Sequence, residues 1–143
     1  MVQEISLDKV SSALEEMIQD SSVIACYLYG SYARGEATPL SDLDIAILWT
    51  KEAPVKERKR ELLRLSEKLS GQLGHEVDVR NLNEASLELQ FRVISEGKVV
   101  LCKDERRRLE FEDRAVMHFL DFKPMIADYN RNMHQRILET GKL

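Results

Sequence analysis

The sequence is poor in residues that would point to unusual chemistry or an unusual environment. It has two cysteines and three prolines among 143 residues, and Cys26 and Cys102 do not form a Cys-x-x-Cys pair. We therefore expect neither a disulfide nor a thiolate metal site, and both thiols should lie reduced in the core. No apolar run is long enough to cross a bilayer, and the run from Ile45 to Trp49 is typical of a buried strand.

Positive charge is also in short supply, with 21 basic residues against 25 acidic ones and a net charge of −4. Broad binding to nucleic acid requires an excess of basic side chains, so this class of partner is not expected. The first ten residues lack the basic-then-apolar layout of a secretion signal. We therefore expect a cytoplasmic protein with no membrane partner, and its length suits one domain.

Apolar spacing divides the chain into alternating helices and strands. Short apolar runs predict strands over 23–29, 44–49, 76–80 and 98–102. Helical stripes predict helices over 8–19, from Pro54 to Gly71 or Gly74, and through the C-terminal region with a break near Pro124. The alternation predicts an α/β (α+β) domain with a helical C-terminal tail.

The segment 85–93 fits either a strand or a helix. Its apolar residues alternate, which favours a strand, but they also form helical stripes on two faces. Asn83 is placed to cap the start of a helix and Gly97 to end it. We therefore predict a helix that is buried on two sides.

One stretch combines the features of an anion-binding site. The first strand ends at Gly30, where the missing Cβ lets a ligand approach the backbone. Ser31 is expected to open a short helix whose free N–H groups face the strand end, and such groups commonly bind phosphate. Arg34 lies one turn further on and is placed to reach the same anion. The intervening Tyr32 fits either stacking on a base or packing beneath the loop.

Three aspartates follow in a pattern that suits a metal. Asp42 and Asp44 are two residues apart at a strand start, so both project from one face while Leu43 and Ile45 face the core. Adjacent carboxylates raise each other's pKa unless a cation lies between them, and Mg²⁺ prefers oxygen ligands. If the strand that carries Asp78 lies alongside, this third acid would help to hold the metal and accept the proton of an attacking hydroxyl.

Taken in order, these residues resemble the motif of DNA polymerase β-like nucleotidyltransferases, and more narrowly of their minimal (MNT-type) members. The matching segments are Gly30-Ser31, Arg34-Gly35 and Ser41-Asp42-Leu43-Asp44. The resemblance implies a mixed sheet flanked by helices, a catalytic domain over 1–102, and ATP as the substrate. It also implies two Mg²⁺ ions held by the catalytic residues Asp42, Asp44 and Asp78. Nucleotide binding is assigned to Gly30, Ser31, Arg34 and Ser41.

Residues 103–143 are expected to form a helical extension packed on the catalytic domain, within a single domain overall. Relatives usually carry a larger acceptor domain here, so this chain would need its acceptor from outside. The resemblance implies a HEPN-type ribonuclease toxin as partner, with AMP transferred to a tyrosine and this chain acting as antitoxin. Candidate docking residues are Met117, Phe119, Phe122, Met125, Tyr129 and Met133.

Two alternatives stay open at this point. One is a small-molecule nucleotidyltransferase with an aminoglycoside-like acceptor bound between two subunits. The other is an antitoxin that acts by binding alone, although a pure binder has no need of three converging acids. Homo-oligomers and hetero-oligomers are both compatible with the sequence.

Overall fold

The computed structural model describes residues 5–19, 22–38, 41–52 and 55–140, with the side chains of the last helix described as far as Phe122 and again at Arg131. The elements are α1 (Leu7–Met17), β1 (Val23–Tyr29), β2 (Leu43–Trp49), α2 (Val55–Leu73), β3 (Val77–Asn81), the 3₁₀ helix η1 (Leu82–Glu84), α3 (Leu87–Glu96), β4 (Lys98–Cys102) and α4 (Glu105–Thr140). Each predicted strand and each of the predicted longer helices is present, with ends shifted by a few residues at most of the boundaries. Pro54, the predicted start of the second helix, lies outside the described residues.

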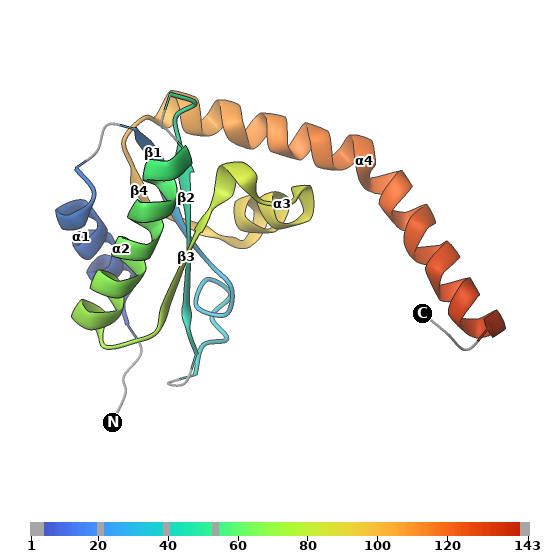
Figure 1. Cartoon of the computed structure of the whole chain (residues 1–143), viewed down its shortest axis with the longest axis horizontal. Coiled ribbons are helices and arrows are strands. Elements are labelled where there is room, and N and C mark those ends of the chain that lie inside the picture. Colours follow the sequence, from blue (N-terminus) through green and yellow to red (C-terminus); the bar gives the residue numbers. More distant parts are fainter. Residues whose placement is uncertain (1–4, 20–21, 39–40, 53–54, 141–143) are drawn as a thin grey trace.

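The four strands form one mixed sheet in the order β3-β2-β1-β4. β1 pairs antiparallel with both β2 and β4, whereas β2 pairs parallel with β3. Figure 1 shows α1 and α2 on one face of this sheet and α3 with the first part of α4 on the other. The sheet is therefore the middle layer of the domain, and β1 and β2 are its central strands.

Alternation along the central strands builds a core on each face of the sheet. Leu28, Leu43, Ile45 and Ile47 are fully buried against the apolar sides of α1 and α2. On the opposite face, Tyr27, Tyr29, Ala46 and Leu48 pack with Leu82 and Val93. Because both faces are covered, β1 and β2 are apolar almost throughout, as expected for strands buried on two sides.

The ambiguous segment is a helix, but it begins later than predicted. Ser86 caps α3 through its side chain, and Asn83 does not. The Asn83 side chain instead accepts the Trp49 N–H at 2.8 Å and donates to the Trp49 carbonyl at 3.0 Å. Gly97 ends the helix as expected. Burial on two sides is less complete than predicted, because Val93 is the one fully buried residue of α3.

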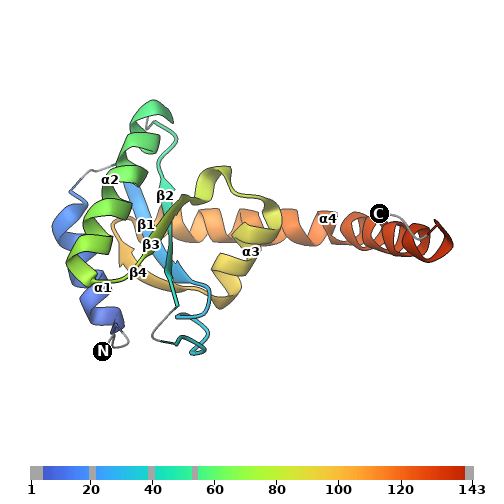
Figure 2. The same ribbon diagram turned by 60° about the horizontal axis from the view of Figure 1, so that its bottom comes forward.

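The predicted helix break near Pro124 is wrong, since α4 continues from Glu105 to Thr140. Figure 1 shows instead that α4 changes direction partway along, as expected for a helix that contains a proline in its interior. In Figure 2 the C-terminal part of α4 extends away from the sheet.

The described candidate docking residues on α4 divide into two groups. Phe119 stacks on Phe91 of α3 with ring centroids 4.2 Å apart, so it belongs to the packing between α3 and α4. Met117 and Phe122 are exposed. The side chains of the other three candidates lie outside the described residues: Met125, Tyr129 and Met133.

The two thiols differ in their surroundings. Both cysteines are free, but Cys102 is exposed at the end of an edge strand, so the expectation of two core thiols is wrong for it. Cys26 is buried, and burial raises the pKa of its thiol to about 12. Among the described residues, no helix is both long and apolar enough to cross a membrane.

A polar contact fastens α4 to the sheet. The hydroxyl of Tyr27, a buried residue of β1, donates to Glu112 at 3.0 Å, and Arg108 donates to the same carboxylate oxygen at 3.0 Å. Burial, followed by the nearby Glu112 charge, raises the pKa of Tyr27, so this hydroxyl stays protonated as a donor. A hydrogen bond to a charged, largely buried acceptor stabilises more than a neutral one.

Removing the Tyr27 hydroxyl should therefore destabilise the protein. We expect Tyr27→Phe to lower the free energy of unfolding by about 1.5 kcal/mol, measured by urea denaturation followed by circular dichroism. Tyr29→Phe is the matched control, because the Tyr29 hydroxyl is buried without a partner among the described residues. Its loss should change the free energy by less than about 0.5 kcal/mol. Equal losses in the two variants would contradict the anchoring role.

Candidate active site

The strand register brings two of the three predicted aspartates side by side. Asp44 of β2 is opposite Asp78 of β3 in the parallel pair and opposite Tyr29 of β1 in the antiparallel pair. Asp42 immediately precedes β2 and is exposed. β3 therefore lies next to β2, as the sequence argument required, and the acids gather at one end of the sheet.

The aspartates at this end of the sheet carry more negative charge than the neighbouring basic side chains neutralise. Burial raises the pKa of Asp44 and the neighbouring Asp78 charge raises it further, whereas Arg80 acts in the opposite direction. Arg80 donates through its Nε to Asp78 at 2.9 Å. Its guanidinium thus supplies the positive charge beside the two carboxylates, a role that sequence analysis did not assign to it.

Gly30 is required by Asp44 itself. It has φ +76°, a left-handed conformation that favours glycine, and a Cβ at this position would collide with Oδ2 of Asp44. The missing side chain therefore makes room for the carboxylate as well as leaving the backbone accessible. The conformation of the turn after β1 and the position of Asp44 at the start of β2 therefore depend on each other.

The short helix predicted to open at Ser31 is not present. Residues 30–35 form consecutive turns, in which the Arg34 N–H donates to the Gly30 carbonyl at 3.2 Å and the Glu36 N–H to that of Ser31 at 2.9 Å. Gly35 also has a positive φ of +72°. Left-handed residues at both ends confine this segment to a compact loop.

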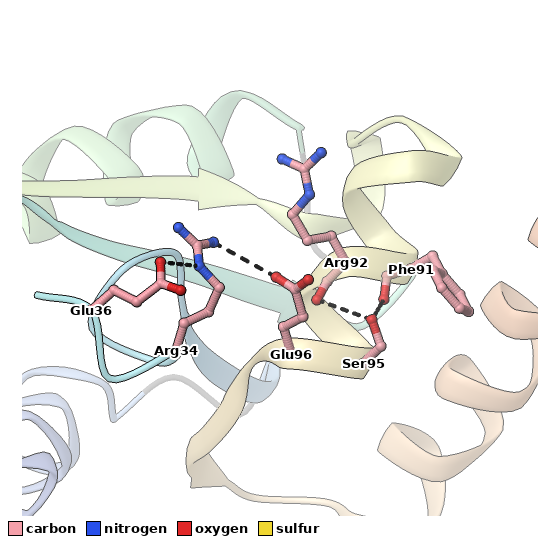
Figure 3. A network of polar contacts seen from close by, with 6 residues as sticks. All are labelled: Arg34, Glu36, Phe91, Arg92, Ser95 and Glu96. Carbon is pink, nitrogen blue, oxygen red and sulfur yellow. Dashed lines mark hydrogen bonds and ion pairs between the residues drawn. The ribbon is translucent and has the colours of Figure 1, made fainter.

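Arg34 reaches from this loop to α3. Its Nε donates to Glu36 at 3.1 Å, and its Nη1 forms an ion pair with Glu96 at 3.7 Å (Figure 3). Figure 3 also shows Arg92 on the same helix, outside these contacts. The charge of Arg34 lowers the pKa of Asp44, although by less than the other groups act on it. Glu96 is a second participant that sequence analysis did not identify.

Ser41 and Tyr32 have structural contacts in the same loop region. The Ser41 hydroxyl accepts the Thr38 N–H at 2.8 Å, which shapes the approach to β2. Tyr32 packs against the core between the sheet and α1 and α2, with its ring 6.1 Å from that of His75 in an edge-on arrangement. Of the two possibilities for Tyr32, the structure favours packing beneath the loop.

The donor chemistry at this end of the sheet fits a hard divalent cation. All three acids present carboxylate oxygens, which Mg²⁺ prefers, and the pKa of Asp44 is raised by burial and then by the neighbouring Asp78 charge, both of which a bound cation would offset. In the part of the chain that is described, no three acidic, histidine or cysteine side chains are close enough to form a preformed metal cluster. Asp42 and the Arg80-bound Asp78 would therefore have to reorient to act with Asp44.

A mixed sheet with paired aspartates beside a glycine turn defines a nucleotidyltransferase-type α+β domain. A family profile described as "Polymerase beta, Nucleotidyltransferase" matches residues 12–106. The chain belongs to this family.

Named relatives extend over most of the chain. It is 32% identical over 97 residues to the protein adenylyltransferase MntA of Shewanella oneidensis, covering 68% of this chain and 66% of the relative. It is also 30% identical over 115 residues to a provisionally named protein adenylyltransferase of Methanocaldococcus jannaschii, covering 80% of this chain and 79% of the relative.

Solved structures share the fold. A crystal structure of a toxin–antitoxin with AMP-PNP has a TM-score of 0.68 at 24% identity, covering 87% of this chain and 98% of that chain. A tri-AMPylated HEPN toxin of Shewanella oneidensis in complex with its MNT antitoxin gives a TM-score of 0.60 at 23% identity, covering 86% and 94%.

The close approach of Gly30 to Asp44 leads to a test with two glycines. Gly30→Ala and Gly35→Ala should each lower the free energy of unfolding by about 1 kcal/mol, because both positions have positive φ. A Cβ at Gly35 meets nothing within 4 Å, so only Gly30→Ala displaces Asp44. We expect nucleotidyl transfer to fall about 100-fold in Gly30→Ala and to be retained in Gly35→Ala, measured at a temperature where both variants are folded. Similar activity in the two variants would contradict this account.

The raised pKa of Asp44 predicts a gain in stability on neutralisation. Because the folded-state pKa exceeds the unfolded one, ionisation of Asp44 costs folding free energy at neutral pH, and this cost is absent below about pH 3.9. Asp44→Asn should therefore unfold at higher urea than the wild type at pH 7, with the difference disappearing near pH 3.5. Asp113→Asn, at an exposed site on α4, should show no such gain. A destabilised Asp44→Asn at pH 7 would refute the electrostatic argument.

Proposed function

We propose that this chain is a Mg²⁺-dependent enzyme that transfers AMP from ATP to a hydroxyl of a partner protein. The acceptor in this proposal is a tyrosine of a HEPN-type ribonuclease toxin, and the chain acts as the cytoplasmic antitoxin. The observation that carries the proposal is the pairing of Asp44 with Asp78 beside Gly30, at one end of the sheet. The names of the similar relatives and of the structurally similar complexes support the choice of nucleotide and acceptor.

In the proposed reaction, the acceptor oxygen bonds to the α-phosphorus of ATP while the bond to the bridging oxygen breaks and pyrophosphate leaves. The acceptor proton passes to Asp78. Mg²⁺ ions held by Asp42, Asp44 and Asp78 would neutralise charge on the phosphates. Gly30 and Ser31 leave the loop backbone open to the triphosphate, and Arg34 and Ser41 are assigned to the same substrate.

Arg80 has a specific place in this scheme. Its Nε donates to Oδ2 of Asp78, so one oxygen of the carboxylate that would accept the proton is engaged by a guanidinium. A bound cation would compete with Arg80 for that carboxylate, because both are attracted by the same negative charge. Release of Arg80 would free Asp78 and leave a positive side chain at the edge of the site, where the polyphosphate would lie.

The proposed division of labour follows the chain. Residues 1–102 form the catalytic unit, and residues 103–143 form an extension that packs on it and meets the partner. α4 contacts α3 and β1 in its first part. It presents exposed Met117, Leu120 and Phe122 before it extends away from the sheet (Figure 2). Exposed apolar side chains on one helix are typical of protein-binding surfaces.

The proposal is tested by mixing the protein with MgATP and the product of its neighbouring gene, followed by intact-mass spectrometry. We expect the neighbouring protein to gain one or more adenylates, because the site is suited to a delivered hydroxyl. Asp44→Asn should abolish the gain, whereas Asp113→Asn should keep it. Omission of Mg²⁺ should also abolish it.

The other outcomes separate the two alternatives from the proposal. A stable complex without a mass gain would mean that the chain neutralises its partner by contact alone. If the neighbouring protein neither gains mass nor binds, while MgATP is consumed with an aminoglycoside-like acceptor, the enzyme acts on small molecules. Either result would overturn transfer to a protein.

A further inference from the structure

A cavity lies at the opposite end of the sheet from the aspartates. β1 and β2 bring Tyr29 beside Asp44 at one end and Val23 beside Trp49 at the other. Asp44 and Trp49 are five residues apart on the same strand, which is about 17 Å. The cavity, of about 510 Å³, opens next to Trp49 between β2 and α4. It is therefore separate from the candidate active site.

The floor and the rim of this cavity differ in character. Ile24 and Leu48 of the sheet and Ala115 of α4 are buried and form an apolar floor. Phe111 is half-buried beside them. Apart from Trp49, the rest of the lining is polar and consists of exposed charged side chains together with Thr50, Asn83, Gln90 and His118. An apolar base below a charged rim is the usual arrangement of a small-molecule site, and the volume lies in the usual range.

Positive charge on the rim is not fully compensated. Arg107 lies 3.8 Å from Glu52 and 3.5 Å from Asp104, and Glu110 pairs with Arg106 at 3.2 Å. The acids on the rim are thus already engaged by arginines. Arg114 and Lys51 also line the cavity, and neither makes an ion pair with any described residue. Lys51 is one of the cations that act on Glu52, so Arg114 is the principal cation left to attract an anion, with Lys51 beside it.

The face of α4 above the cavity explains why the space is open. Arg107, Phe111, Arg114 and His118 follow one another at intervals of four, three and four residues, which places them on one side of the helix. A helix that only covered a sheet would have apolar residues in this stripe. Here long, hydrated side chains flank Phe111, so α4 closes over the sheet incompletely.

We propose that this cavity binds a small organic anion with a flat apolar body, such as an aromatic phosphate monoester. The body lies on Ile24, Leu48 and Phe111, and the anionic group meets Arg114 and Lys51. A guanidinium is suited to this role because its planar donors pair with two phosphate oxygens at once. Binding here would be independent of the aspartates and of nucleotidyl transfer.

The position of Trp49 provides the measurement. It is the only tryptophan in the sequence and it lines the cavity. The probe is 4-methylumbelliferyl phosphate, whose absorption overlaps tryptophan emission, so bound probe accepts energy from Trp49. We expect saturable quenching of Trp49 fluorescence. Arg114→Ala should weaken the affinity about tenfold, because it removes a charge-assisted contact. Lys51→Ala should weaken it as well.

Matched variants make the result specific. Arg60→Ala removes the same charge from an exposed site on α2 outside the cavity, so its affinity should equal that of the wild type. Asp44→Asn should also bind normally, and excess MgATP should not displace the probe. Circular dichroism melting of each variant confirms that it is folded.

Several outcomes would overturn the proposal. These are the absence of saturable quenching, an unchanged affinity in both Arg114→Ala and Lys51→Ala, or an equal loss in Arg60→Ala. Displacement by MgATP that Asp44→Asn prevents would assign the probe to the nucleotide site instead. None of these results depends on whether the protein transfers AMP, so the cavity and the proposed function fail or succeed separately.

Discussion

Mutual repulsion among carboxylates at one end of the sheet is the constraint on which the site depends. Parallel pairing of β2 with β3 places Asp44 beside Asp78, and burial then makes the charge on Asp44 more costly. Two features offset this charge. Arg80 lies on β3 and donates to Asp78, and the glycine at the end of β1 leaves room for the Asp44 carboxylate. A well-packed core on both faces of β1 and β2 holds the strands in register despite this unfavourable charge.

Much of this arrangement could be predicted because it depends on local patterns. Apolar runs located the strands, and period-two alternation correctly directed Leu43 and Ile45 into the core. The order Gly-Ser, Arg-Gly, Ser-Asp-x-Asp located the loop and the first acids. Parallel adjacency of β2 and β3, which decides whether Asp78 joins Asp44, could be stated from the sequence only as a condition. Pairing between strands is a tertiary property and leaves no periodic signal in either strand.

The errors have tertiary causes as well. Asn83 looks like a helix cap, but its amide is more strongly used in satisfying both backbone groups of Trp49. The helix expected at Ser31 is replaced by turns because two left-handed glycines confine the loop. Glu96 was missed as a partner of Arg34, since the two residues are distant in sequence and meet only when α3 folds back over the sheet. Propensity describes each segment alone, and these contacts are made between segments.

The length of α4 also determines how far the domain can reach. An unbroken helix of 36 residues rises about 54 Å along its path, about two to three times the length of a strand of the sheet. Its first turns are held to β1 through Glu112, so the position of its far end is set by the sheet and not by a flexible linker. A macromolecule gripped at that far end would be kept at a set distance and angle from the aspartates. The length and direction of the helix would then decide which hydroxyl groups of the bound macromolecule can reach the aspartates.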